Sequence, residues 1–173
     1  LDYTIDGTFT PVRTSFPKFD GFVFDDPSKY FSTEETEVAS GTTDENGDAT
    51  ITSSIDIGSS APGMLAASLV TRVFEESGDF SLDGMRVTYS PYKRYVGIRS
   101  PQKDRSQLNT GPKHTFEVAM ADYRGNALAN QNVTLRIYKV SWYWWWGSSN
   151  GRLANYISDS DHRPVERKSV TTG

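Results

Sequence analysis

The chain has 173 residues, with 18 lysines and arginines against 22 aspartates and glutamates, two histidines, four tryptophans and no cysteine. The lack of cysteine excludes disulfides, a thiol nucleophile and cysteine-ligated metals within these residues, and two histidines are too few for a multi-histidine metal centre. The net charge of −4 argues against a dedicated nucleic-acid-binding protein, and no apolar run approaches the roughly 18 residues that span a bilayer, so we expect no membrane insertion.

Apolar and polar residues alternate with a period of two over most of the chain, which is typical of half-buried strands. Asn46 and Gly47 predict a tight turn, because both tolerate positive φ. The apolar set near residue 84 changes parity at Asp83 and Gly84, which predicts a bulge or a turn there. In the first half of the chain we expect four strands, at residues 3–12, 49–55, 65–74 and 80–90.

A polar stretch at residues 90–94 interrupts this rhythm, and the rhythm then restarts. We expect a turn at residues 122–126 and strands at residues 95–99, 114–121, 133–140 and, more weakly, 153–157 and 167–170. No segment of ten residues shows a helical period. The pattern predicts an all-β chain of two consecutive immunoglobulin-like antiparallel β-sandwich domains, residues 1–93 and 94–173, each short enough to be truncated at its outer end.

Acidic residues gather at three places, none with the spacing of a catalytic or metal site. The turn at residues 44–48 resembles the start of a calcium loop, but Ala49 and Ile55 stand where that loop needs glycine and glutamate. Asp25 and Asp26, and residues 34–37, are interpreted as solvated loops rather than as paired catalytic carboxylates. No nucleophile elbow, phosphate-binding loop or zinc-protease motif is present. We therefore predict a chain that is not an enzyme and has no cofactor and no metal.

The most unusual feature is an aromatic cluster that contains all four tryptophans. Its members are Trp142, Tyr143, Trp144, Trp145 and Trp146. Successive strand residues point to opposite faces, so one core cannot bury them all. The cluster either contacts a neighbouring domain or protein partner, or stacks on sugar rings. We favour the domain contact, because a fragment exposes surfaces that its parent chain buries.

Several segments, taken in order, resemble the bacterial alpha-2-macroglobulin family. Residues 14–27 carry a Phe-Pro, glycine and aromatic pattern that precedes a Thr-Thr-Asp-x-x-Gly turn at residues 42–47. Residues 90–99 are similar to that family's link into the bait-region-bearing domain. Residues 135–145 are similar to a strand of that domain and its aromatic hairpin.

The resemblance implies consecutive macroglobulin-like domains, the second being the N-terminal part of the bait-region-bearing domain. It implies a non-catalytic scaffold fragment of a broad-spectrum endopeptidase inhibitor, a protease trap of the cell envelope whose parent is exported or lipid-anchored. The expected partners are neighbouring domains of the same chain and target proteases. A thioester needs cysteine, so it would lie outside these residues. Candidate protease-accessible residues are Arg163, Arg167 and Lys168. The alternative is a carbohydrate- or protein-binding β-sandwich module that uses Trp142–Trp146.

Overall fold

The computed structural model describes residues 1–173 except 34, 56, 58–59, 103–107, 110 and 139–165. The described residues form antiparallel strands and contain no helix, so none of them could cross a membrane as a helix. The chain divides into two units. The first unit comprises Leu1–Arg13 and Phe31–Pro91, and the second comprises Thr14–Tyr30 and Tyr92–Gly173. The prediction of an all-β antiparallel fold is confirmed.

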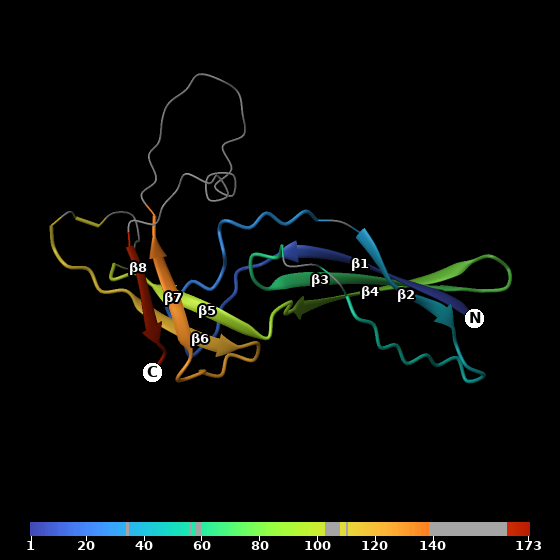
Figure 1. Ribbon diagram of the computed structural model, residues 1–173. Helices are drawn as coiled ribbons and strands as arrows, with labels where there is room; N and C mark the ends of the chain where they lie inside the picture. Colours follow the sequence, from blue (N-terminus) through green and yellow to red (C-terminus); the bar gives the residue numbers. More distant parts are fainter. Residues whose placement is uncertain (34, 56, 58–59, 103–107, 110, 139–165) are drawn as a thin grey trace, which may run out of the picture. The chain divides into compact units, whose positions relative to one another are not determined.

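The first unit is built on a four-stranded antiparallel sheet with the strand order β2-β1-β3-β4 (Figure 1). Its strands are β1 (Asp2–Pro11), β2 (Glu35–Thr42), β3 (Leu65–Phe74) and β4 (Phe80–Tyr89). The pairing of β1 with β3 and of β3 with β4 runs without interruption over ten residues of each strand. The strands expected near residues 3–12, 65–74 and 80–90 are therefore confirmed.

The core of the first unit lies on the face of the sheet that carries Phe9. Phe9 pairs with Ala67 across the β1–β3 ladder, and both side chains are buried. The ring of Phe9 meets Tyr89 edge-on, with centroids 5.7 Å apart. The Tyr89 hydroxyl donates to the carbonyl of Ile55 at 3.3 Å, so the chain after β2 passes over this face. The opposite face carries an ion pair between Arg72 and Asp6.

Three predictions for the first unit are wrong. Residues 49–55 form no strand. The fourth strand of the sheet is β2, which begins at Glu35, within the acidic stretch that the sequence predicts as a solvated loop. β2 is an edge strand, where charged residues such as Glu35 and Glu37 are tolerated. The pairing of β4 with β3 is continuous through Asp83 and Gly84, so no bulge lies there. β4 is the other edge strand, and almost all of its residues are exposed. The shift of its apolar residues from even to odd positions therefore does not require a bulge, because neither face of the strand is buried.

The described residues of the second unit form two antiparallel strand pairs (Figure 1). β5 (Arg94–Arg99) pairs with β6 (Glu117–Asp122), and β7 (Asn132–Ile137) pairs with β8 (Glu166–Thr171). The expected turn at residues 122–126 is present, with Gly125 at a φ of 82°. The tight turn with Gly47 in the first unit is present as well, at a φ of 87°. The weak strand expected at residues 153–157 lies outside the described residues.

The segment Thr14–Tyr30 supplies an aromatic core to the second unit. Phe16 and Phe24 are buried and meet edge-on, with ring centroids 4.9 Å apart, and Phe16 contacts Tyr95 at 5.7 Å. Val23 forms an antiparallel bridge with Ile98 of β5, and both backbone hydrogen bonds are made. A stretch from the first third of the sequence thus completes a unit whose strands all lie after residue 93.

Candidate functional site

The most distinctive surface of the second unit is an apolar groove beside β7 and β8. The groove has a volume of about 320 Å³. Its lining combines four apolar residues with His114, Thr115, Glu166 and Lys168. The apolar residues of the groove are Phe116, Leu135, Ile137 and Val170.

The strand register explains why these side chains share one face. Directly opposed residues of an antiparallel pair point to the same side. Leu135 faces Lys168 and Ile137 faces Glu166, so one face of the β7–β8 pair is apolar with a charged margin. The other face carries polar and basic residues, including Thr134, Arg136 and Arg167.

The apolar face of β7 becomes more exposed along the strand. Val133 is 8% exposed, Leu135 is half-buried and Ile137 is 55% exposed. Phe116 is 41% exposed on the same groove. Among the described residues, the apolar face of β7 is therefore covered at Val133 and uncovered at Ile137. That end adjoins the point where the chain leaves β7.

The three candidate protease-accessible residues fall in two different regions. Arg167 and Lys168 have exposed side chains in β8, and their backbones pair with Arg136 and Leu135 of β7. Arg163 lies outside the described residues. The aromatic cluster Trp142–Trp146 lies outside them too, within the stretch 139–165 that joins β7 to β8 in the sequence.

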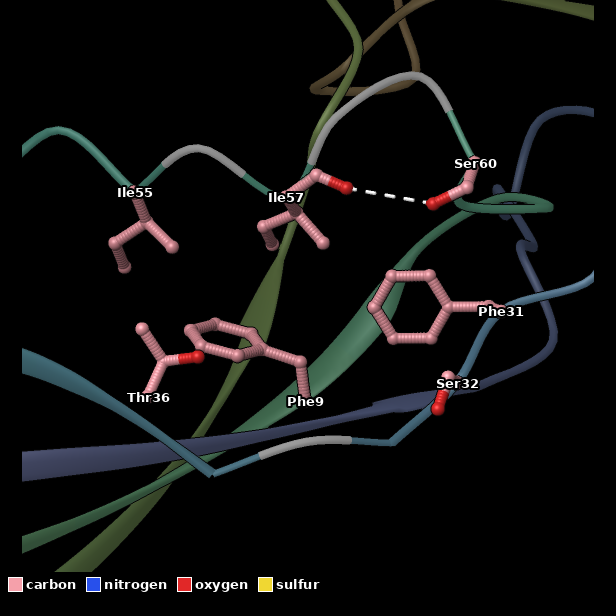
Figure 2. A pocket seen from close by; sticks show the side chains of 7 residues that line it. All are labelled: Phe9, Phe31, Ser32, Thr36, Ile55, Ile57 and Ser60. Atoms are coloured by element: carbon pink, nitrogen blue, oxygen red, sulfur yellow. Dashed lines mark hydrogen bonds between the residues drawn. The ribbon is translucent and has the colours of Figure 1, made fainter.

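A second hollow, of about 210 Å³, lies in the first unit over the ring of Phe9 (Figure 2). Ile55 and Ile57 lie on one side of it and Phe31 on another, and the Ser60 hydroxyl donates to the carbonyl of Ile57 at 3.4 Å. Ser32 and Thr36 complete the lining. The hollow can accept a small apolar group, and its few hydroxyls offer no acid or base.

The carboxylates of Asp25 and Asp26 hold loops in place. Both oxygens of Asp25 accept from the buried Thr14 amide, at 3.0 and 3.2 Å. Asp26 accepts from the amide and the hydroxyl of Ser28, at 2.9 and 2.6 Å. The Asp26 carboxylate is bound by a residue two positions later, as in a turn, whereas the Asp25 carboxylate joins two segments eleven residues apart. They are half-buried structural groups, not freely solvated ones as the sequence had indicated.

Two aspartates sit at equivalent turns and have lowered pKa values. The hydrogen bond from the backbone amide of Asp48 is the largest cause of the lowered pKa of Asp44, and the hydrogen bond from the backbone amide of Asn46 is the next. The side-chain amide of Asn126 lowers the pKa of Asp122, and the Asn126 backbone amide adds to this. Donors to the ionised form explain both shifts. Among the described residues no three His, Asp or Glu side chains gather where they could hold a metal.

Sequence reasoning missed the groove, although part of its signal was present. The alternation of Val133, Leu135 and Ile137 predicted a buried face, and only the structure shows that Ile137 remains uncovered. Phe116 was assigned to a strand, but it precedes β6 and lines the groove. No local pattern distinguishes an apolar residue that covers a core from one that rims an open groove.

Known protein families account for most of the chain. The family model for the bacterial alpha-2-macroglobulin MG5 domain matches residues 2–80, and the model for bacterial macroglobulin domain 6 matches residues 97–173. The solved structure of Escherichia coli alpha-2-macroglobulin activated by porcine elastase is similar over 99% of this chain, with 15% identity and a TM-score of 0.47. This chain spans 15% of that chain. A search of curated proteins finds no match.

Proposed function

Since the chain belongs to the bacterial alpha-2-macroglobulin family, with two consecutive macroglobulin domains, we propose that it is a non-catalytic scaffold part of a protease trap. The observation that carries this proposal is the order of the matches, domain 5 over residues 2–80 followed by domain 6 over residues 97–173. The proposed domain boundary, at residues 93 and 94, falls between them. The site residues described above hold loops and form apolar hollows, which suits a scaffold.

In this proposal the stretch from residue 139 to Lys168 presents cleavage sites to the target protease. It combines basic, aromatic and aliphatic side chains, which together suit proteases of several specificities. A protease binds several residues of its substrate as an extended chain, so their backbone groups must be free of hydrogen bonds to other strands. Arg167 and Lys168 meet this need only when β8 separates from β7. Arg163 precedes Pro164, whose ring removes the backbone N–H and fixes φ, so a trypsin-like enzyme would cut there poorly.

The parent chain would work outside the cytoplasm, at the cell envelope, because that is where it can meet foreign proteases. Its partners would be its own neighbouring domains and the proteases that cut it. Fractionation of cells that express the full-length parent would check the location. Recovery with the cytoplasmic fraction alone would contradict it.

The test of the trap is cleavage of the full-length parent by trypsin. We expect a first cut between residues 139 and 168, mapped by mass spectrometry, followed by compaction in small-angle X-ray scattering. The captured trypsin should still cut a small chromogenic peptide but be protected from a large protein inhibitor. The double variant R167Q/K168Q should leave the first cut in place if it lies before β8. Cleavage with neither compaction nor protection would reject the inhibitor function.

A further inference from the structure

The turn at residues 44–48 contains an asparagine followed directly by a glycine, Asn46 and Gly47. Both residues are exposed, and Gly47 has a φ of 87°. A Cβ atom at Gly47 would meet no atom within 4 Å, so the space beside its backbone is open. Among the described residues no other asparagine precedes a glycine, and Asn150, which also does so, lies outside them.

Such a pair carries the groups for a reaction that needs no enzyme. The backbone nitrogen after an asparagine can attack the side-chain carbon Cγ, and the bond from Cγ to Nδ2 then breaks. The proton of the attacking N–H leaves with the amino group as ammonia, and a succinimide ring remains. Water then opens the ring at either carbonyl, which gives aspartate or isoaspartate. Glycine favours the attack, because no side chain crowds its nitrogen.

We propose that Asn46 is a site of spontaneous deamidation, and that Asp44 sets its rate by holding the turn closed. The attacking nitrogen is that of Gly47, whose N–H donates to the carbonyl of Asp44 at 3.0 Å. The reaction has to remove the proton of this N–H, so the hydrogen bond must break first. Opening of the turn therefore precedes the chemical step.

The side chain of Asp44 holds the backbone on both sides of Gly47. Its Oδ1 accepts from the backbone amides of Asn46 and Asp48, both at 2.9 Å. The amide of Asp44 in turn donates to the carbonyl of Asp48 at 2.8 Å. These donors also lower the pKa of the Asp44 carboxyl, so the acceptor is ionised at neutral pH. Loss of this carboxylate would remove two of the hydrogen bonds that keep the turn closed.

Two further turns have the same backbone hydrogen bonds without the reactive pair. In residues 75–79 and 122–126 the glycine at the fourth position donates to the carbonyl of the first residue at 3.0 Å, and the first amide donates to the carbonyl of the fifth residue. The third position holds Ser77 or Arg124, where the first turn has Asn46. The turn geometry therefore does not require an asparagine there, and the chain provides matched turns for comparison.

Deamidation would alter the turn in two ways. Either product adds a negative charge beside Glu45 and Asp48. Isoaspartate also adds a carbon atom to the backbone, which changes the spacing that joins Gly47 to Asp44. The amide of Thr43, just before the turn, donates to the carbonyl of Leu1. The altered turn would thus adjoin the paired ends of β1 and β2.

Peptide mapping by mass spectrometry, after incubation of the 1–173 chain at mildly alkaline pH, tests the proposal. The method separates aspartate and isoaspartate at residue 46 from any product at Asn150. We expect product at residue 46 in the folded wild type before any at Asn126 or Asn132, which precede alanine and valine. Asp44→Ala should raise the rate by roughly five- to thirtyfold, the range expected when one or two hydrogen bonds that hold the turn are lost.

Three variants serve as controls, and circular dichroism should show the same β content in all of them. Asp44→Asn keeps an acceptor oxygen without the charge and should react at close to the wild-type rate. Asp122→Ala opens the matching turn of the second unit and should leave the rate at residue 46 unchanged. Asn46→Ser, which copies the turn at residues 75–79, should remove the product.

The proposed control by Asp44 would be overturned if Asp44→Ala reacted at the wild-type rate, if Asp44→Asn reacted as fast as Asp44→Ala, or if Asp122→Ala caused an equal acceleration. The site itself would be overturned if neither the wild type nor Asp44→Ala formed product at residue 46 under conditions in which the urea-unfolded chain does.

Discussion

Gly97 lies in β5 directly against the ring of Phe24. A Cβ atom at this position would stand 2.5 Å from Cε1 of Phe24 and within 2.8 Å of two further ring atoms. Carbon atoms in contact normally lie about 3.5–4.0 Å apart. The ring is itself held by Phe16 and cannot withdraw freely. The close packing of the aromatic core therefore requires a glycine at position 97.

Gly97→Ala should destabilise the second unit by about 1–3 kcal/mol, the usual cost of forcing extra volume into a packed core. Hydrogen exchange of the β5 and β6 amides would measure this loss. Gly84→Ala is the control, because its Cβ would meet only the carbonyl of Leu69, at 3.8 Å. Equal protection of β5 and β6 in wild type and Gly97→Ala would contradict the packing argument.

Asn126→Ala should raise the pKa of Asp122 toward the ordinary value of 3.8, because it removes the largest cause of the depression. A depressed folded-state pKa contributes stability above the unfolded value, and that contribution is lost as the pH falls through the folded value. The wild type should therefore lose more stability than the variant on acidification below about pH 4.

Carboxyl NMR titration would follow both Asp122 and Asp44 in this experiment. Asp44 occupies an equivalent turn in the first unit and should titrate identically in wild type and variant. An unchanged pKa at Asp122 would show that the backbone amides alone set it.

At the scale of elements, the alternation of apolar and polar residues correctly predicts the inner strands of the sheet but not its edge strand β2. β1 and β3 lie inside the sheet, and the sequence predicts both closely. β2 begins with Glu35 and Glu37, which look like loop residues, whereas residues 49–55 alternate but pair with no strand. An edge strand has one neighbour and much solvent, so its side chains are weakly constrained. Whether such a segment becomes a strand depends on its pairing with a distant part of the chain.

The same limit applies to the segment Thr14–Tyr30. Its aromatic residues signal burial, but nothing local indicates which unit buries them. Phe16→Ala should lower the stability of the second unit by about 3–5 kcal/mol, as is usual for a buried phenylalanine. Hydrogen exchange should show the loss in β5 and β6, since Phe16 contacts Tyr95 and Phe24.

The matched control is Phe9→Ala, which removes an equally buried ring from the first unit. Its effect should fall on β1 and β3, where Phe9 faces Ala67. If Phe16→Ala instead weakened β1 and β3, the assignment of the segment to the second unit would fail.

At the scale of the whole molecule, the order of motifs predicts the family and the all-β architecture, and both are confirmed. Of the candidate site, the sequence predicts the aromatic cluster and the basic residues. It does not predict the groove, which needs Phe116 from outside the β7–β8 pair. Composition alone also leaves a carbohydrate-binding module open, because tryptophans stack on sugars as readily as on protein.

A glycan array separates these two uses of the tryptophans. We expect a flat response from the 1–173 chain, because the aromatic cluster is expected to contact protein rather than sugar. Binding to a defined class of glycan that is lost in Trp144→Ala would support the carbohydrate-binding alternative.

Each of the two units is built from two separate segments of the sequence. The backbone passes from the first unit to the second after Arg13, returns after Tyr30 and crosses again after Pro91. Three covalent connections therefore join them. A nick at any one crossing leaves the units tethered by the other two, and no single pair of cuts excises the second unit intact. A graft of this unit into another protein must carry Thr14–Tyr30 with it, either through a circular permutation or as a separate peptide supplied in trans.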